Sequence, residues 1–146
     1  GAGAGGGTMV KVLSGANLSV IQDFFAYDTT FLGGVYVGSG NIGGGTFDKI
    51  LVGAGAGGGP NVRVFDNSAN MVQNFFAYAV GFTGGVRVST GLMSATSTSA
   101  DIITGAGIGG GPNVSTFNSL DQPFPLNFFA FSPSFEGGIF VAGRAS

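Results

Sequence analysis

A glycine-rich motif recurs at a fixed interval along this chain. The string GAGAGGG begins at Gly1, GAGAGGGP at Gly53 and GAGIGGGP at Gly105, so successive copies start 52 residues apart. Further motifs follow each copy in the same order, among them PNVRVF, NFFAY and FTGGVRV in the second unit. A fixed period of about this length indicates stacked supersecondary units that cannot bury their apolar faces alone. We therefore interpret residues 1–146 as a single β-repeat domain with repeat units 1–52, 53–104 and 105–146.

Each unit predicts four short β-strands. Glycine and β-branched residues fill every segment, and no window carries apolar residues at helical spacing for three turns. Within Asn61–Phe65, Val62 and Val64 alternate with Arg63 and Phe65, as in a strand. We expect the second unit to form strands at Lys49–Val52, Asn61–Phe65, Met71–Tyr78 and Gly85–Ser89. The predicted fold class is all-β, with each repeat a four-stranded antiparallel blade in an incomplete propeller or blade array.

The glycine loop also contains the spacing of a dinucleotide-binding fingerprint. In KILVGAGAGG (Lys49–Gly58) a predicted strand leads into G-x-G-x-x-G. A dinucleotide site needs a helix whose N-terminus receives the pyrophosphate, whereas here Pro60 and another strand follow. We therefore predict a structural turn in which glycine permits positive φ and close backbone approach.

Composition argues against several classes of function. The chain has no His and no Cys, and its seven Asp and Glu residues vary in position between units, so we expect no catalytic residue and no cofactor. Five Lys and Arg residues against seven acids give a net charge of −2 and no basic stripe for nucleic acid. Apolar runs are strand-sized, so we expect no membrane insertion. The chain has no initiator Met and no signal peptide, and we interpret it as a processed product or an excerpt.

The repeat motifs resemble those of a known family. The segments GAGAGGGPNVRVFD (Gly53–Asp66), NFFAYAVGFTGGVRV (Asn74–Val88) and DIITGAGIGGGPNV (Asp101–Val114) are similar to the FG-GAP/VCBS-like repeats of integrin-α-type β-propellers in bacterial secreted and surface proteins. The resemblance covers essentially the whole chain. It implies a propeller blade and an extracellular or cell-surface location, but such propellers serve adhesion, ligand binding and scaffolding alike.

In that family the loop before the first strand is usually an acidic calcium loop, D-x-N-G-D-G-x-x-D. The matching segments here, Gly40–Lys49 and Gly91–Asp101, have lost most of the carboxylates: Lys49 replaces the closing acid of the first, and only Asp101 survives in the second. Calcium takes six to eight oxygen ligands, several of them carboxylates. We therefore expect no metal site, and we expect Asp101 to accept hydrogen bonds at a turn or strand start.

Repeated aromatic residues and two sequons are the remaining candidate sites. Phe24, Phe75 and Phe128 recur at one blade position, and for these residues or their neighbours packing between blades is favoured over stacking on sugars. Asn17 and Asn113 each begin an N-x-S sequon and are glycosylation candidates.

The number of strands indicates how the protein works. The predicted strands number about eleven and leave one blade short, and open edges template pairing with another chain. We therefore expect a noncatalytic extracellular structural or adhesive module that self-assembles with copies of itself into a ring or filament. The residues expected to carry this self-assembly are Val10, Val12, Leu13, Ile139 and Val141. The alternative is a lectin-like propeller that binds surface glycans between its blades.

Overall fold

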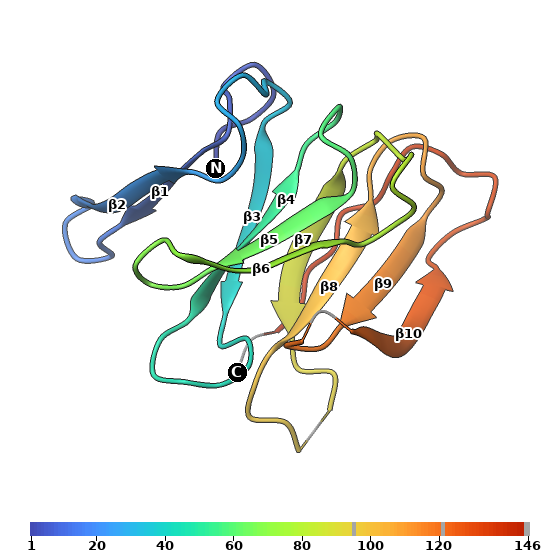
Figure 1. The fold of residues 1–146 in the computed structure, drawn as a ribbon. Coiled ribbons are helices and arrows are strands. Elements are labelled where there is room, and N and C mark those ends of the chain that lie inside the picture. Colours follow the sequence, from blue (N-terminus) through green and yellow to red (C-terminus); the bar gives the residue numbers. More distant parts are fainter. Residues whose placement is uncertain (95, 121, 145–146) are drawn as a thin grey trace.

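The chain folds into three antiparallel β-sheets that stand side by side (Figure 1). The computed structural model describes residues 1–94, 96–120 and 122–144, without the side chains of residues 124 and 125. This part of the chain contains ten strands and no helix, so it offers no helix for crossing a membrane. The all-β prediction is confirmed.

The sheets contain two, four and four strands. The first pairs β1 (Met9–Leu13) with β2 (Val20–Phe25). The second has the order β3 (Val35–Gly40), β4 (Lys49–Ala54), β5 (Asn61–Phe65) and β6 (Met71–Phe76). The third repeats this order with β7 (Val86–Gly91), β8 (Asp101–Ala106), β9 (Asn113–Phe117) and β10 (Pro123–Phe129). Within each sheet, consecutive strands are therefore neighbours.

The sheets are out of phase with the expected grouping of strands. The strand expected at Gly85–Ser89 is β7, which pairs with β8 in the third sheet and not with the strands before it. The two four-stranded sheets thus span residues 35–76 and 86–129. Connections 41–48, within a sheet, and 77–85, between sheets, have similar lengths, so spacing alone does not reveal where a sheet begins.

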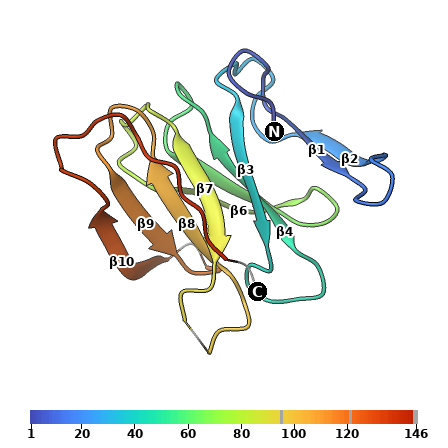
Figure 2. The ribbon, with the colours of Figure 1, turned by 180° about the vertical axis from the view of Figure 1, so that it is seen from behind.

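The segment after β10 returns to the inner side of the third sheet. Figure 2 shows it passing beside β7. The amide of Ile139 donates to the carbonyl of Ala106 (3.0 Å), and the amide of Gly143 donates to Ser89 Oγ (3.0 Å). By sequence position this segment corresponds to β3 and β7, so it lies where the first strand of a further blade would begin.

Apolar side chains pack between neighbouring sheets. One cluster joins Val62 and Val64 of β5 to Val86 of β7 and Phe117 of β9, and a second joins Val10 of β1 to Phe65 of β5. The alternation of β5 explains this arrangement, because successive side chains point to opposite faces of a sheet. Each blade is thus buried by its neighbours and not by its own strands.

Aromatic rings repeat the same contact at each junction between sheets. Phe24 of β2 packs on Phe65 of β5 with ring centroids 4.8 Å apart, and Phe75 of β6 packs on Phe117 of β9 at 4.9 Å. Tilted rings at this separation stabilise the pair beyond area burial alone. The prediction that these repeated phenylalanines fill the space between blades is confirmed for Phe24 and Phe75.

Glycine lets the backbones of successive units come into direct contact. Gly85 has φ of +80°, and a Cβ there would lie 2.6 Å from the carbonyl carbon of Gly55 in the preceding loop. The amide of Gly57 donates across this junction to the carbonyl of Thr83 (2.8 Å), and that of Gly107 donates to the carbonyl of Gly85 (3.0 Å). Only glycine combines this φ with such close approach. The predicted structural role of the glycine loop is therefore confirmed.

We expect Gly107→Ala to destabilise the protein by about 1–3 kcal/mol, the usual cost of overpacking. An added Cβ would collide with the Gly84 carbonyl group, whose carbon lies 2.6 Å away and whose atoms belong to the backbone. Gly81→Ala is the control, because a Cβ there meets nothing within 4 Å, and it should change the free energy of unfolding by about 0.5 kcal/mol or less. Chemical denaturation measures both, and equal stability of the two variants would contradict the close-approach argument.

Candidate functional site

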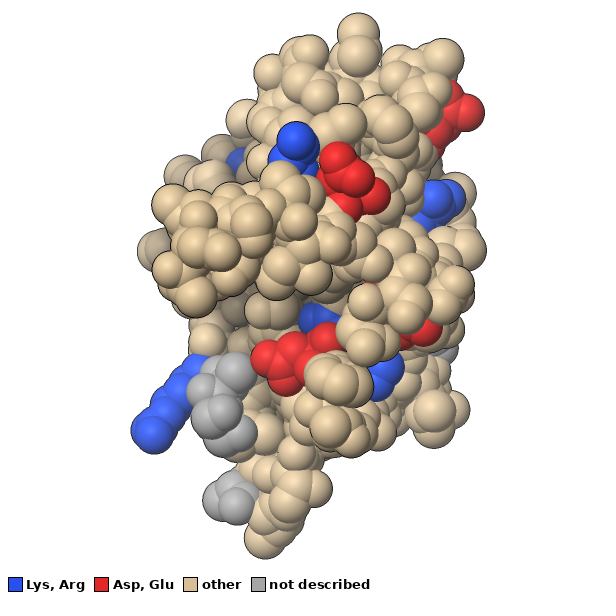
Figure 3. All heavy atoms as spheres, turned by 90° about the vertical axis from the view of Figure 1, so that its left-hand side faces the viewer, with Lys and Arg blue, Asp and Glu red and all other residues tan. Residues whose placement is uncertain are grey.

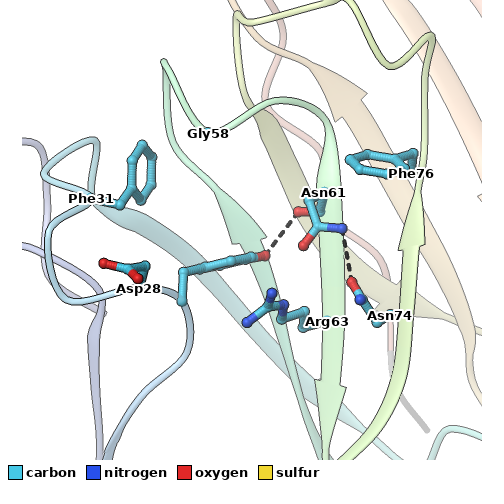
Figure 4. A pocket seen from close by; sticks show the side chains of 8 residues that line it. Asp28, Phe31, Gly58, Asn61, Arg63, Asn74 and Phe76 are labelled. Atoms are coloured by element: carbon cyan, nitrogen blue, oxygen red, sulfur yellow. Dashed lines mark hydrogen bonds between the residues drawn. The ribbon is translucent and has the colours of Figure 1, made fainter.

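A groove of about 380 Å³ lies between the first and second sheets (Figure 4). The loop after β2 supplies Asp28 and Phe31 on one side, and β6 supplies Asn74 and Phe76 on the other. Between them β5 contributes Asn61 and Arg63, whose side chains share the face of β5 that is turned to the first sheet, since they are two positions apart. The groove therefore combines aromatic walls with amide and charged groups.

Tyr27 and Arg63 hold the two sheets together beneath this groove. The Tyr27 hydroxyl lies within hydrogen-bond distance of the carbonyl oxygens of Asn61 (2.8 Å) and Val52 (3.0 Å) in the second sheet. In return, Arg63 Nη1 donates to the Ala26 carbonyl (2.8 Å) and its guanidinium carbon lies 4.6 Å from the centre of the Tyr27 ring. The cation–π contact and the hydrogen bonds all stabilise the packing of the first sheet against the second. The residues at the bottom of the groove are thus held in place.

Burial and hydrogen bonding shift the pKa of two groups here in opposite directions. Burial raises the pKa of the Tyr27 phenol, with the positive charge of Arg63 a smaller, opposing influence. Hydrogen bonds from the Thr30 hydroxyl (2.6 Å) and amide (2.8 Å) lower the pKa of the exposed Asp28 carboxyl. At neutral pH the groove therefore presents a neutral phenol and a carboxylate.

The junction between the second and third sheets has the same tyrosine contact at its bottom but lacks the two charged residues. Tyr78 lies at the repeat position of Tyr27, and its hydroxyl bonds to the Asn113 carbonyl (3.0 Å) and to Thr104 Oγ1 (3.1 Å). Ala79 and Ser115 occupy the positions of Asp28 and Arg63. Sequence reasoning did not single out Arg63 and Asp28. The signal was present for Asp28, because the other repeats carry the neutral residues Ala79 and Ser132 at its position, whereas the position of Arg63 carries Lys11 and Ser115.

The five residues expected to carry self-assembly lie in different environments. Val10 and Ile139 are buried within the chain, at 2% and 5% exposure, in separate clusters. Val12 is half-buried on β1, and Val141 packs against the cluster that contains Ile139. Leu13, at the end of β1, is 48% exposed. The surface that these residues leave available to a neighbour is thus centred on Leu13.

The two sequon asparagines also differ. Asn17 is exposed in the β1–β2 turn, where its side-chain oxygen accepts a hydrogen bond from the Ser19 amide (3.1 Å). Asn113 is half-buried in β9 and its Nδ2 donates to Asn127 Oδ1 (2.8 Å). The side-chain nitrogen that would receive a sugar is therefore free of a described partner at Asn17 and engaged at Asn113.

A lysine occupies the first of the loops that resemble calcium loops. Lys49 Nζ donates to the carbonyl oxygens of Ile42 and Gly44, the latter at 3.4 Å. In the second loop, the carboxylate of Asp101 at the start of β8 accepts a hydrogen bond from the Met93 amide (3.2 Å), as expected for a strand-start acceptor. Residues 1–94, 96–120 and 122–144 bring together no group of three or more carboxylates. The ammonium group thus supplies a positive charge to carbonyls of the first loop.

We expect the free energy of unfolding to fall between pH 10 and 12. Burial raises the pKa of Tyr78 from 10.0 to about 12, so the folded state favours the neutral phenol. This contribution is complete below pH 10, where the unfolded chain also keeps its proton, and is lost as the pH rises to about 12. Denaturation at stepped pH measures it. The third unit has Phe131 at the repeat position of Tyr78. The variant Tyr78→Phe should therefore lose less stability over this pH range, and a loss identical to that of the natural protein would contradict the assignment of the effect to Tyr78.

We expect calcium to leave the melting temperature unchanged and Lys49→Met to lower it. The substitution keeps the aliphatic stem but removes the donor for two loop carbonyls, at a cost of about 1–3 kcal/mol. Thermal melts in calcium and in EDTA should coincide for the natural protein. Lys11→Met is the control, at an exposed position on β1, and its melting temperature should equal that of the natural protein. A rise of several degrees with calcium would show that the loops bind the ion.

Comparisons with known proteins do not assign this site. No family model matches the chain, no curated protein matches it, and no solved structure matches it. The resemblance to FG-GAP/VCBS-like repeats therefore stays a prediction from the repeated motifs.

Proposed function

We propose that this protein is a noncatalytic structural module of secreted or surface type that assembles head to tail with copies of itself. One observation carries the proposal. The chain makes the same contact between sheets twice and exposes the two halves of a third contact at opposite ends of the sheet array.

The unused aromatic half lies on the third sheet. Phe128 on β10 has the repeat position of Phe24 and Phe75, yet it is 49% exposed, because the described chain places no sheet against it. The matching position on the first sheet is Leu13, which corresponds to Phe65 and Phe117 and is 48% exposed. A neighbouring copy would bring Leu13 onto Phe128 as Phe65 is brought onto Phe24. Burying two such side chains stabilises association through the hydrophobic effect.

The backbone of the first sheet has an unused edge as well. β5 pairs with strands on both sides, whereas among the described strands β1 pairs with β2 alone. Such an edge presents unpaired amides and carbonyls that another chain can satisfy. Gly1 and Ala2 have the repeat positions of Gly53 and Ala54, which pair with Tyr36 and Val35 of β3. By the same register they would meet Phe140 and Ile139 of a neighbouring copy.

Surface charge does not oppose this association. Viewed from the β1–β2 side, the molecule shows a few positive and negative side chains, some of them side by side, on a largely uncharged surface (Figure 3). The chain as a whole carries a net charge of only −2. Association of the first sheet with the third sheet of another copy joins two different surfaces, and repetition of such a contact gives a ring or a filament.

We expect Phe128→Asp to prevent assembly, because it places a carboxylate in the apolar contact and raises the dissociation constant at least tenfold. Phe47→Asp is the matched control: Phe47 is 63% exposed in the β3–β4 loop of the second sheet. Native mass spectrometry and light scattering over a concentration series should show oligomers for the natural protein and for the control. A natural protein that stays monomeric at the highest attainable concentration, or equal assembly of both variants, would contradict the proposal.

A further inference from the structure

We propose that the groove between the first and second sheets binds a neutral saccharide of one or two rings. The groove lies within a single chain and at a junction that is already formed, so this inference is independent of head-to-tail assembly. It rests on three observations: the arrangement of the aromatic walls, the hydrogen-bond donors of the groove that have no described partner, and the absence of the same charged residues from the second junction.

The walls offer apolar surfaces on two sides. Phe31 stands on the first-sheet side and Phe76 on the β6 side, with the amide and guanidinium groups of β5 between them (Figure 4). Phe76 is 51% exposed, although it follows a phenylalanine that is packed between sheets. A pyranose ring has an apolar face of C–H groups and a rim of hydroxyls. It can therefore cover an aromatic wall and reach polar groups at the same time.

The polar groups keep unused hydrogen-bonding capacity. Asn61 Nδ2 donates to Asn74 Oδ1 (2.8 Å) and to the Phe75 carbonyl (3.2 Å), which orients the Asn74 amide with its nitrogen free of any described partner. Arg63 Nη1 is engaged by Ala26, while its Nε is buried without a partner in the described part of the chain. Buried unpartnered donors are uncommon in native proteins. The Asp28 carboxylate, which only accepts hydrogen bonds, lines the opposite side of the groove from Asn74.

Charge decides among ligand classes. The groove contains one cation, Arg63, and one anion, Asp28, so it offers no net attraction to a phosphate, a carboxylate or an amine. Sugar hydroxyls both donate and accept hydrogen bonds, and neighbouring hydroxyls can bridge an arginine or amide donor and a carboxylate acceptor. A neutral sugar therefore matches the groove better than a charged ligand does.

The second junction shows that these charges are not required by the fold. It keeps a tyrosine, Tyr78, at the bottom of the junction. It also keeps the pair of asparagines, since Asn113 donates to Asn127 as Asn61 does to Asn74. It carries Ala79 in place of Asp28 and Ser115 in place of Arg63. A junction of this fold thus forms with neutral residues at both positions. At the first junction Arg63 contacts Ala26 and Tyr27, and ligand binding would give the charged residues a second role.

The test uses saturation-transfer NMR and calorimetry on the full chain with methyl glycosides of glucose, galactose, mannose and N-acetylglucosamine. At least one should bind, with a dissociation constant on the order of 1 mM or lower. Asp28→Ala and Arg63→Ser, each copying the residue of the second junction, should weaken binding about tenfold or more. Thermal melts monitor folding of every variant.

Asp66→Ala is the matched control for the carboxylate. Asp66 is a half-buried acid whose pKa is likewise lowered by hydrogen bonds from its own turn, but it lies in the β5–β6 turn outside the groove. This variant should bind as the natural protein does. The inference is overturned if none of the four glycosides binds, if methyl glucuronide binds and the neutral sugars do not, or if Asp28→Ala and Asp66→Ala bind equally well.

Discussion

Direct contact between glycine backbones of successive repeats is the constraint on which this structure depends. Each glycine pair that precedes a first strand, such as Gly84–Gly85, lies between the glycine loop of its own sheet and that of the preceding one. Amides of the loops donate across these junctions. Because no side chain separates the backbones, the sheets approach closely enough for the apolar faces of β5 and β9 to be buried by their neighbours.

The same repetition explains both proposed activities. A junction that works between two units of one chain supplies a contact surface at each end of the array, which supports assembly of copies. Residues that differ between the two junctions indicate a second role, ligand binding. Arg63 and Asp28 occur where the other junction has Ser115 and Ala79, while Tyr27 and Tyr78 keep the same anchoring role in both. The packing residues are thus the same at both junctions, and the candidate binding residues differ between the two junctions.

Most of the fold was predictable because strand alternation and turns are local. The strand at Asn61–Phe65 and the hairpin turn at Asp66, which accepts hydrogen bonds from Ser68 and Asn70, follow from neighbouring residues alone. The phase of the sheets was not predictable, since it depends on which of two similar connections crosses between sheets. The groove was missed for the same physical reason: Asp28 and Arg63 line one groove only after two sheets pack together.

Amide hydrogen exchange at the junction glycines tests this account most directly. Gly57 and Gly109 lie in loops and are exposed, so their amides would exchange rapidly unless they keep the hydrogen bonds to Thr83 and Glu136. If the glycine contacts join the sheets into one cooperative unit, both amides will show protection close to that of the central strands β4 and β8. Rapid exchange at both, with the strands still protected, would show that the sheets are held together by side-chain packing alone.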